Sequence, residues 1–99
     1  DFDAKIAQIE AADAVIPALR ALEPDVLVIT GDHSTPASLA AHSWHPVPVL
    51  LHAPATVRRD AVTGFGERAV TAGGLGRRPA QDLMALALAH AGRLGKYGA

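Results

Sequence analysis

The run Val26-Leu27-Val28-Ile29 is the feature that most constrains how this chain can fold. It is rich in β-branched residues and shows no polar alternation, a pattern typical of a strand that is buried on both faces in a parallel sheet. Such a strand needs helices or sheet packed against it on each side. A chain of 99 residues can form at most one domain with a modest core. The run therefore indicates a sheet that this chain cannot enclose by itself.

A long helix is expected before this strand. Apolar residues recur at three- and four-residue steps among charged residues and alanines, which predicts an amphipathic helix from Asp3 to Leu22. Asp1 or Asp3 can cap its start, and Pro17 should kink it. The helix should end before Pro24, because the residue that precedes a proline avoids helical angles.

The rest of the chain offers few further elements. A second apolar strand is expected over residues 47–51, and Pro48 places it at an edge or a bulge. The following stretch is rich in glycine, and only residues 68–71 could form a third strand. A last helix is expected over residues 79–94, with Gly95 just past its end and apolar residues on several sides. The sequence thus predicts an incomplete α/β unit, which more chain or a homo-oligomer would have to complete.

Composition excludes several classes of function. Nine basic and ten acidic residues nearly cancel, so neither nucleic acid nor an anionic membrane is an expected partner. Apolar residues at 49% and charged residues at 19% are typical of a packed protein. The chain has no cysteine, which excludes disulfides and thiolate zinc sites and fits a cytoplasmic protein. No apolar run approaches the roughly 20 residues that a membrane span needs.

The residues that carry chemistry follow the first strand. Asp32 and His33 lie just beyond its carboxyl end, where open parallel sheets place ligands and catalytic groups. A carboxylate oxygen and an imidazole nitrogen together suit zinc, manganese or a related divalent ion. Gly31 gives the backbone the freedom to turn there. The plainer alternative is that Asp32 caps a helix and His33 is a surface residue.

Two more histidines, His42 and His45, precede the second strand. Three histidines between residues 33 and 45 are hard to explain as packing, since a buried imidazole needs partners for both of its nitrogens. His52 and His90, by contrast, are interpreted as structural. The histidines around the two strand ends therefore favour a metal site.

Longer stretches resemble a known family. They are Asp25–Pro36 (DVLVITGDHSTP), Ala41–Val49 (AHSWHPVPV), Phe65–Arg68, Gly73–Arg77 and Leu83–Leu94, and they cover essentially the whole chain. They are similar to the archaeal-type, cofactor-independent phosphoglycerate mutases of the alkaline phosphatase superfamily. The resemblance implies an α/β fold in which residues 1–99 form the C-terminal portion of a metalloenzyme domain, a fragment of an alkaline-phosphatase-like parallel sheet flanked by helices.

The same resemblance implies a site with two divalent ions. Asp32 and His33 match ligands of one ion, and His42 matches a ligand of the other. Manganese or magnesium is the expected metal, with zinc or cobalt as alternatives. His45 matches no ligand of the family and is expected to hydrogen-bond a ligand or to face the substrate.

The resemblance also implies an activity for the parent protein. The family is an isomerase of glycolysis that interconverts 2-phosphoglycerate and 3-phosphoglycerate through a phosphoserine intermediate. Its nucleophilic serine lies near the family's N-terminus, so Ser34, Ser38 and Ser43 are not expected to be catalytic, and the chain alone should be inactive. Its partner would be the missing N-terminal part or a second copy. The alternatives are a phosphatase or sulfatase relative, or a non-catalytic metal-binding or interaction module.

Overall fold

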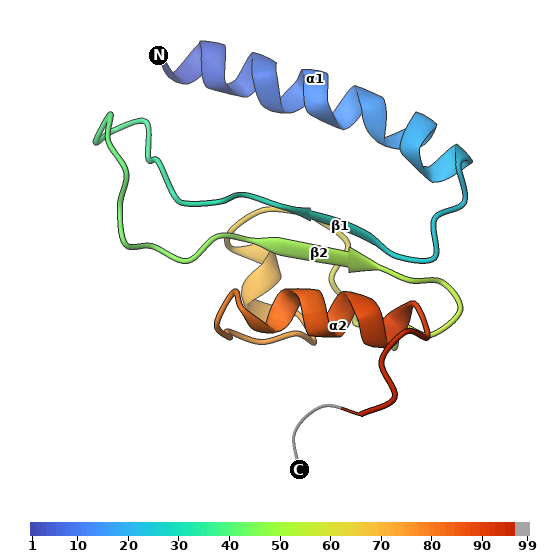
Figure 1. Cartoon of the computed structure of the whole chain (residues 1–99). Helices are drawn as coiled ribbons and strands as arrows, with labels where there is room; N and C mark the ends of the chain where they lie inside the picture. The colour runs from blue at the N-terminus through green and yellow to red at the C-terminus, as the bar shows by residue number, and fades with distance from the viewer. Residues whose placement is uncertain (97–99) are drawn as a thin grey trace.

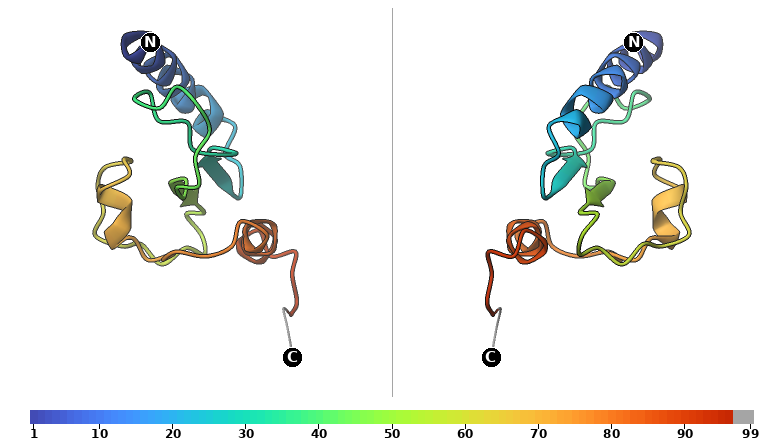
Figure 2. Two further views of the ribbon diagram at one scale, coloured as in Figure 1. Left: turned by 90° about the vertical axis from the view of Figure 1, so that its left-hand side faces the viewer. Right: turned by 90° about the vertical axis from the view of Figure 1, so that its right-hand side faces the viewer.

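The computed structural model describes residues 1–96, which form two helices, a pair of strands and a short 3-10 helix. Their bounds are α1 (Phe2–Ala21), β1 (Leu27–Thr30), β2 (Val49–His52), η1 (Ala69–Ala72) and α2 (Asp82–His90). Down the view of Figure 1 the order is α1, β1, β2, α2. The segment that contains η1 swings out to one side, as both end views in Figure 2 show. The α/β class is therefore confirmed.

Helix α1 begins and ends close to where the sequence predicts. The Asp1 carboxylate accepts hydrogen bonds from the backbone N–H groups of Asp3, at 3.0 Å, and Ala4, at 3.2 Å, and so caps the first turn. The helix continues through Pro17 for about one more turn. Glu23 then adopts a left-handed backbone with φ of 52° directly before Pro24, so the helix cannot continue.

The sheet differs from the expectation. Strands β1 and β2 pair antiparallel, with Leu27 opposite His52 and Thr30 opposite Val49. We expected a parallel sheet because the first strand has no polar alternation. Residues 31–48, which join the strands, form no crossover helix, so β2 returns alongside β1 in the opposite direction. The parallel sheet is not seen among residues 1–96, and the residues of β1 are at most half-buried.

The possible third strand over residues 68–71 is not formed, because Ala69–Ala72 is the 3-10 helix η1. The Val70 N–H donates to Gly66 O at 3.0 Å, and the Thr71 hydroxyl donates to Arg68 O at 2.7 Å. These local bonds satisfy backbone groups that a strand would offer to a neighbour. The β-branched residues here therefore belong to a turn.

Helix α2 is shorter than the helix expected over residues 79–94. Gly92 has a positive φ of 73°, and its N–H donates to Ala89 O at 3.1 Å. The next N–H, that of Arg93, donates to Leu88 O at 2.8 Å. This pair of bonds is a Schellman motif, in which a left-handed glycine ends the helix. The helix therefore ends at His90, before Gly95.

Few side chains of the described residues are buried from solvent. Within residues 1–96, Ala53 is the one hydrophobic residue that is fully buried. The accessible surface is 7932 Å², whereas a compact protein of this mass exposes about 5,300 Å². The radius of gyration is 15.0 Å, against about 13 Å for a compact domain of this length. No helix in the described part of the chain combines the length and apolar character that a membrane span requires.

Candidate functional site

The candidate site lies in the connection between β1 and β2, residues 31–48. Connections of this length without regular structure are uncommon in compact domains and are often functional. Beyond Thr30 and Val49 the pairing stops, and it resumes at one isolated antiparallel bridge between Ser34 and Ser43. Residues 31–33 on one side of this interruption face residues 44–48 on the other. Pro46 and Pro48 lie on the longer side, and neither can donate a backbone hydrogen bond.

Asp32 and His33 lie within this interruption, directly after β1. The His33 backbone N–H donates to one carboxylate oxygen of Asp32, Oδ1, at 2.9 Å. The other oxygen, Oδ2, is 3.4 Å from His33 Nε2. The Asp32 side chain is 86% exposed and the His33 side chain 43% exposed, so both side chains are open to solvent. The backbone bond therefore orients the carboxylate toward the imidazole.

The Asp32–His33 geometry fits a shared ion. Two ligand atoms that are each about 2.1 Å from a tetrahedral ion lie about 3.4 Å apart, which matches the separation of Oδ2 and Nε2. Among residues 1–96, no three histidine, aspartate or glutamate side chains gather into a set that could hold one ion. Asp32 and His33 therefore form a pair of candidate ligands and not a full coordination shell.

His42 lies beside His33, and Thr35 connects the two. The ring centroids of the histidines are 3.8 Å apart, with 50° between the ring planes. Thr35 Oγ1 is 3.1 Å from His33 Nδ1 and 2.9 Å from His42 Nδ1. Both histidines therefore bond through Nδ1, which leaves Nε2 as the nitrogen that can bind a metal. The structure thus places the His42 ring beside the His33 ring, and His33 beside the Asp32 carboxylate, while the three side chains do not form one ligand set within residues 1–96.

His45 takes part in a separate contact. Its Nδ1 is 2.8 Å from the Ser43 hydroxyl, and its ring stacks on Trp44 with centroids 4.2 Å apart. Ser34 and Ser43 hold the isolated bridge through Ser43 N–H, which donates to Ser34 O at 2.9 Å. The sequence suggested that Ser34 and Ser38 cap a short helix or support the loop. The structure instead has a turn at residues 37–40 and no helix there.

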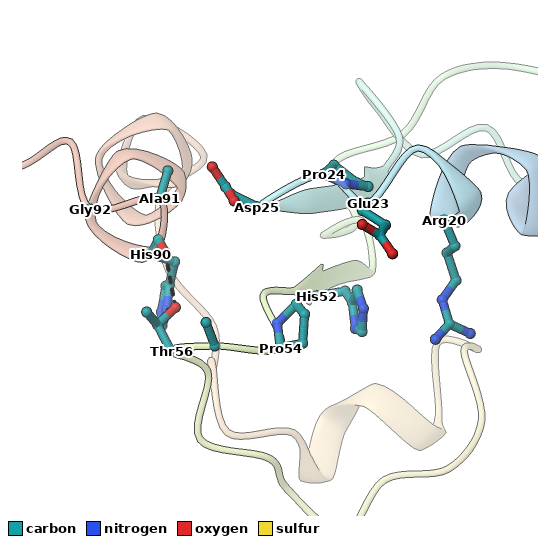
Figure 3. A pocket seen from close by; sticks show the side chains of 11 residues that line it. Arg20, Glu23, Pro24, Asp25, His52, Pro54, Thr56, His90, Ala91 and Gly92 are labelled. Carbon is teal, nitrogen blue, oxygen red and sulfur yellow. Dashed lines mark hydrogen bonds between the residues drawn. The ribbon is translucent and has the colours of Figure 1, made fainter.

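A cavity of about 560 Å³ lies elsewhere, at the opposite end of the strand pair (Figure 3). The Thr56 hydroxyl donates to His90 O at 3.0 Å, so the 2.8 Å bond between Thr56 Oγ1 and His90 Nδ1 must be donated by the imidazole. This bond ties the turn after β2 to the end of α2, as a structural role for His90 requires. None of the three predicted ligands lines the cavity, whose residues are Arg20, Glu23, Pro24, Asp25, His52, Pro54, Ala55, Thr56, His90, Ala91 and Gly92.

Two residues that position the site were missed from the sequence. Thr35 bonds both candidate ligand histidines, and the Lys5 ammonium donates to its backbone carbonyl from helix α1. A hydroxyl two residues after His33 is a weak signal by itself. The bridge between Ser34 and Ser43, which places Thr35 opposite His42, is the information that would have revealed it.

The chain matches one protein family model and several known proteins. The Metalloenzyme superfamily matches residues 1–90. A Thermus thermophilus protein is 56% identical over 99 residues, and one from Thermotoga neapolitana is 57% identical over 98 residues. Both are named probable 2,3-bisphosphoglycerate-independent phosphoglycerate mutase. They are matched over 100% and 99% of this chain, which spans only 24% of the length of each.

A solved structure agrees in shape. A protein from Pyrococcus horikoshii matches with a TM-score of 0.83 and 41% identity, and the match covers 92% of this chain and 28% of that protein. The superfamily implies divalent metal ions, and the carboxylate and imidazole groups of the β1–β2 connection are suitable donors for them. The match over residues 1–90 shows that this chain belongs to the Metalloenzyme superfamily.

Proposed function

We propose that this chain supplies part of the two-metal active site of a cofactor-independent phosphoglycerate mutase, a cytoplasmic isomerase of glycolysis that interconverts 2-phosphoglycerate and 3-phosphoglycerate. Asp32 and His33 bind one ion, and His42 binds the other. The observation that carries the proposal is the 3.4 Å separation of Asp32 Oδ2 and His33 Nε2, with the His42 ring beside them. The names of the two relatives support the same activity.

Mixed oxygen and nitrogen donors suit manganese, and magnesium, zinc and cobalt are the alternatives. Bound ions would offset the negative charge that develops on the transferring phosphoryl group. The chain's own part is to hold the carboxylate and the imidazoles at a fixed separation. His45, which stacks on Trp44, is proposed to hydrogen-bond a ligand or to face the substrate, and not to bind metal.

The rest of the parent protein is proposed to complete the site. Two side chains fill at most half of a tetrahedral shell, so further ligands must come from elsewhere. The serine that carries the phosphoryl group and the arginines that hold the glycerate carboxylate are assigned to that remaining part. Residues 1–99 would form the C-terminal portion of the domain, with parallel strands flanking β1 and β2. The chain alone is therefore expected to be inactive.

The test uses the full-length protein with Asp32→Ala, His33→Ala or His42→Ala. Loss of a group that merely supports a metal ligand costs about 10–100-fold in affinity or activity, so loss of a ligand should lower mutase turnover by more than about 100-fold. A coupled assay of 2-phosphoglycerate formation measures turnover, and metal analysis measures the bound ions. Each variant should also lose bound metal.

Asp25→Asn and His52→Gln are the matched controls, because both residues lie at the end of the strand pair that is remote from the connection. They should retain turnover and metal. Near-normal turnover in any of the three alanine variants would remove that residue from the ligand set. Hydrolysis of a phosphate monoester without isomerisation would favour a phosphatase-type relative, and a full-length protein that neither binds metal nor turns over would indicate an interaction module.

A further inference from the structure

Thr35 is not a candidate metal ligand, yet its hydroxyl contacts two of the residues that are. Its hydroxyl oxygen is 3.1 Å from Nδ1 of His33 and 2.9 Å from Nδ1 of His42, so one atom touches the imidazoles assigned to two different ions. Its side chain is less exposed than those of the two histidines, and Lys5 holds its backbone carbonyl. A hydroxyl fixed in this way can control both rings.

The proton count restricts what this hydroxyl can do. A threonine oxygen has one proton to donate and two lone pairs that accept. If the hydroxyl donated to one Nδ1, that neutral imidazole would carry its own proton on Nε2 and could not bind a metal through that nitrogen. If both Nδ1–H groups donate to the two lone pairs, both Nε2 atoms are free to bind metal. Only this second arrangement suits two ligand histidines.

We propose that Thr35 is a positioning residue that accepts a hydrogen bond from Nδ1–H of both His33 and His42, and so sets the metal-binding tautomer of one ligand from each ion. This inference rests on the proposed function, which assigns the two histidines to metal. The hydroxyl links the two ion sites through 3.1 Å and 2.9 Å contacts. A change at Thr35 should therefore weaken both ions together, whereas a change at one histidine removes a ligand from one ion.

The first experiment compares Thr35→Val with Thr35→Ser in the full-length protein. Valine keeps the branched shape but removes the acceptor, and serine keeps the hydroxyl. Calorimetric titration of the metal-free protein with Mn²⁺ should show affinity about 10–100-fold lower for Thr35→Val at both sites, and affinity within a few-fold of normal for Thr35→Ser. Ser38→Ala, which removes an exposed hydroxyl from the same connection, should leave the affinity unchanged.

The second experiment reads the tautomers directly. Selective ¹⁵N-histidine labelling and long-range NMR correlations of the metal-free protein, at a pH where imidazole is neutral, should show His33 and His42 both protonated at Nδ1. In Thr35→Val this shared preference should be lost at least in part. A protein in which one of the two histidines is protonated at Nε2 would overturn the double-acceptor arrangement.

The outcomes separate this inference from the proposed function. If His33→Ala and His42→Ala lower metal affinity but Thr35→Val stays within twofold of normal, the role of Thr35 is wrong and the metal site stands. If Thr35→Ser is as impaired as Thr35→Val, the hydroxyl is not what matters, and the inference also fails. If none of these variants changes metal affinity, the proposed function itself fails.

Discussion

Asp60 shows how one exposed side chain organises the segment around η1. Its carboxylate accepts hydrogen bonds from Gly74 N–H at 2.7 Å and Val62 N–H at 3.0 Å. The Gly74 bond, and then the Val62 bond, lower the pKa of Asp60 below its ordinary value of 3.8. A carboxyl whose pKa falls on folding stabilises the folded segment above pH 3.8, and this contribution is lost as the pH falls through the lower, folded pKa.

Asp60→Asn should remove this pH dependence, because the amide cannot ionise. In the unmodified protein, the NMR shift of the Gly74 amide should titrate with a midpoint below 3.8, and in the variant this step should be absent. Asp13→Asn, a change on exposed α1, is the matched control and should leave the step in place. A midpoint at or above 3.8 would contradict the assignment.

The sequence points to single candidate residues where their chemistry shows in the residue type. Asp32, His33 and His42 stand out because carboxylate and imidazole groups follow or precede apolar runs. Thr35 does not stand out, because its role depends on the isolated Ser34–Ser43 bridge that sets it opposite His42. Asp60 was missed for the same reason, since its partner Gly74 lies fourteen residues along the chain. Local sequence patterns do not show which segments, far apart along the chain, lie in contact.

Among the elements, α2 shows why a helix end is hard to place from sequence. Gly92 and Gly95 both follow its apolar residues, and the predicted end was set by Gly95 because Leu94 continues the apolar pattern. The structure gives the left-handed conformation to Gly92 alone of the two. Backbone conformation, which the residue type does not encode, therefore decided the end of the helix.

Gly92→Ala should destabilise the end of α2 by about 1 kcal/mol, because alanine adopts the left-handed conformation at a cost that glycine avoids. Space is not the obstacle, since a Cβ at Gly92 would meet nothing within 4 Å. Urea denaturation of the full-length protein gives the free energy of unfolding. Gly95→Ala also meets nothing within 4 Å and lacks the positive φ, so it should cost much less. Equal effects of the two changes would contradict the Schellman motif as the cause.

The direction of strand pairing shows a second limit of the sequence. The apolar run at Val26–Ile29 correctly predicted a strand, and Asp1, Leu22 and Pro24 correctly predicted the bounds of α1 within one or two residues. Whether two strands run parallel depends on the path of the chain between them. That path, through residues 31–48, contains irregular turns and three prolines with no periodicity to interpret.

For the molecule as a whole, the dominant fact is uncovered apolar surface. Phe2 is 66% exposed, Leu22 77% and Met84 68%. Accessible surface of 7932 Å² exceeds the value of a compact protein of this mass by about half. Surface of this kind is normally covered by partner segments. The sequence already predicted this shortage of cover, because its elements were too few for a strand apolar on both faces.

The isolated chain should therefore unfold in a broad, weakly cooperative thermal transition and bind a hydrophobic dye such as ANS. The described part of the chain has one fully buried hydrophobic residue, so its hydrophobic core is too small for a cooperative unfolding transition. The full-length parent should show a steeper transition and less dye binding. Circular dichroism measures the thermal transition, and ANS fluorescence measures the dye binding. A sharp transition without dye binding in the isolated chain would mean that it covers its own surface, for example as a homo-oligomer.

The strand pair has one further consequence, which concerns aggregation. Within residues 1–96, β1 and β2 form a sheet of two strands, so each has an outer edge without a strand beside it. The run Val26–Ile29 contains no charge and no proline, the features that usually protect an edge from pairing with another molecule. Asp25 directly precedes the run, and Asp32 follows it after Thr30 and Gly31, so these two charges are placed to disfavour such pairing. A parent protein that is cleaved or only partly synthesised would therefore expose strand edges that can pair with another molecule. The charges of Asp25 and Asp32 oppose this pairing, and Asp32 is also a proposed metal ligand.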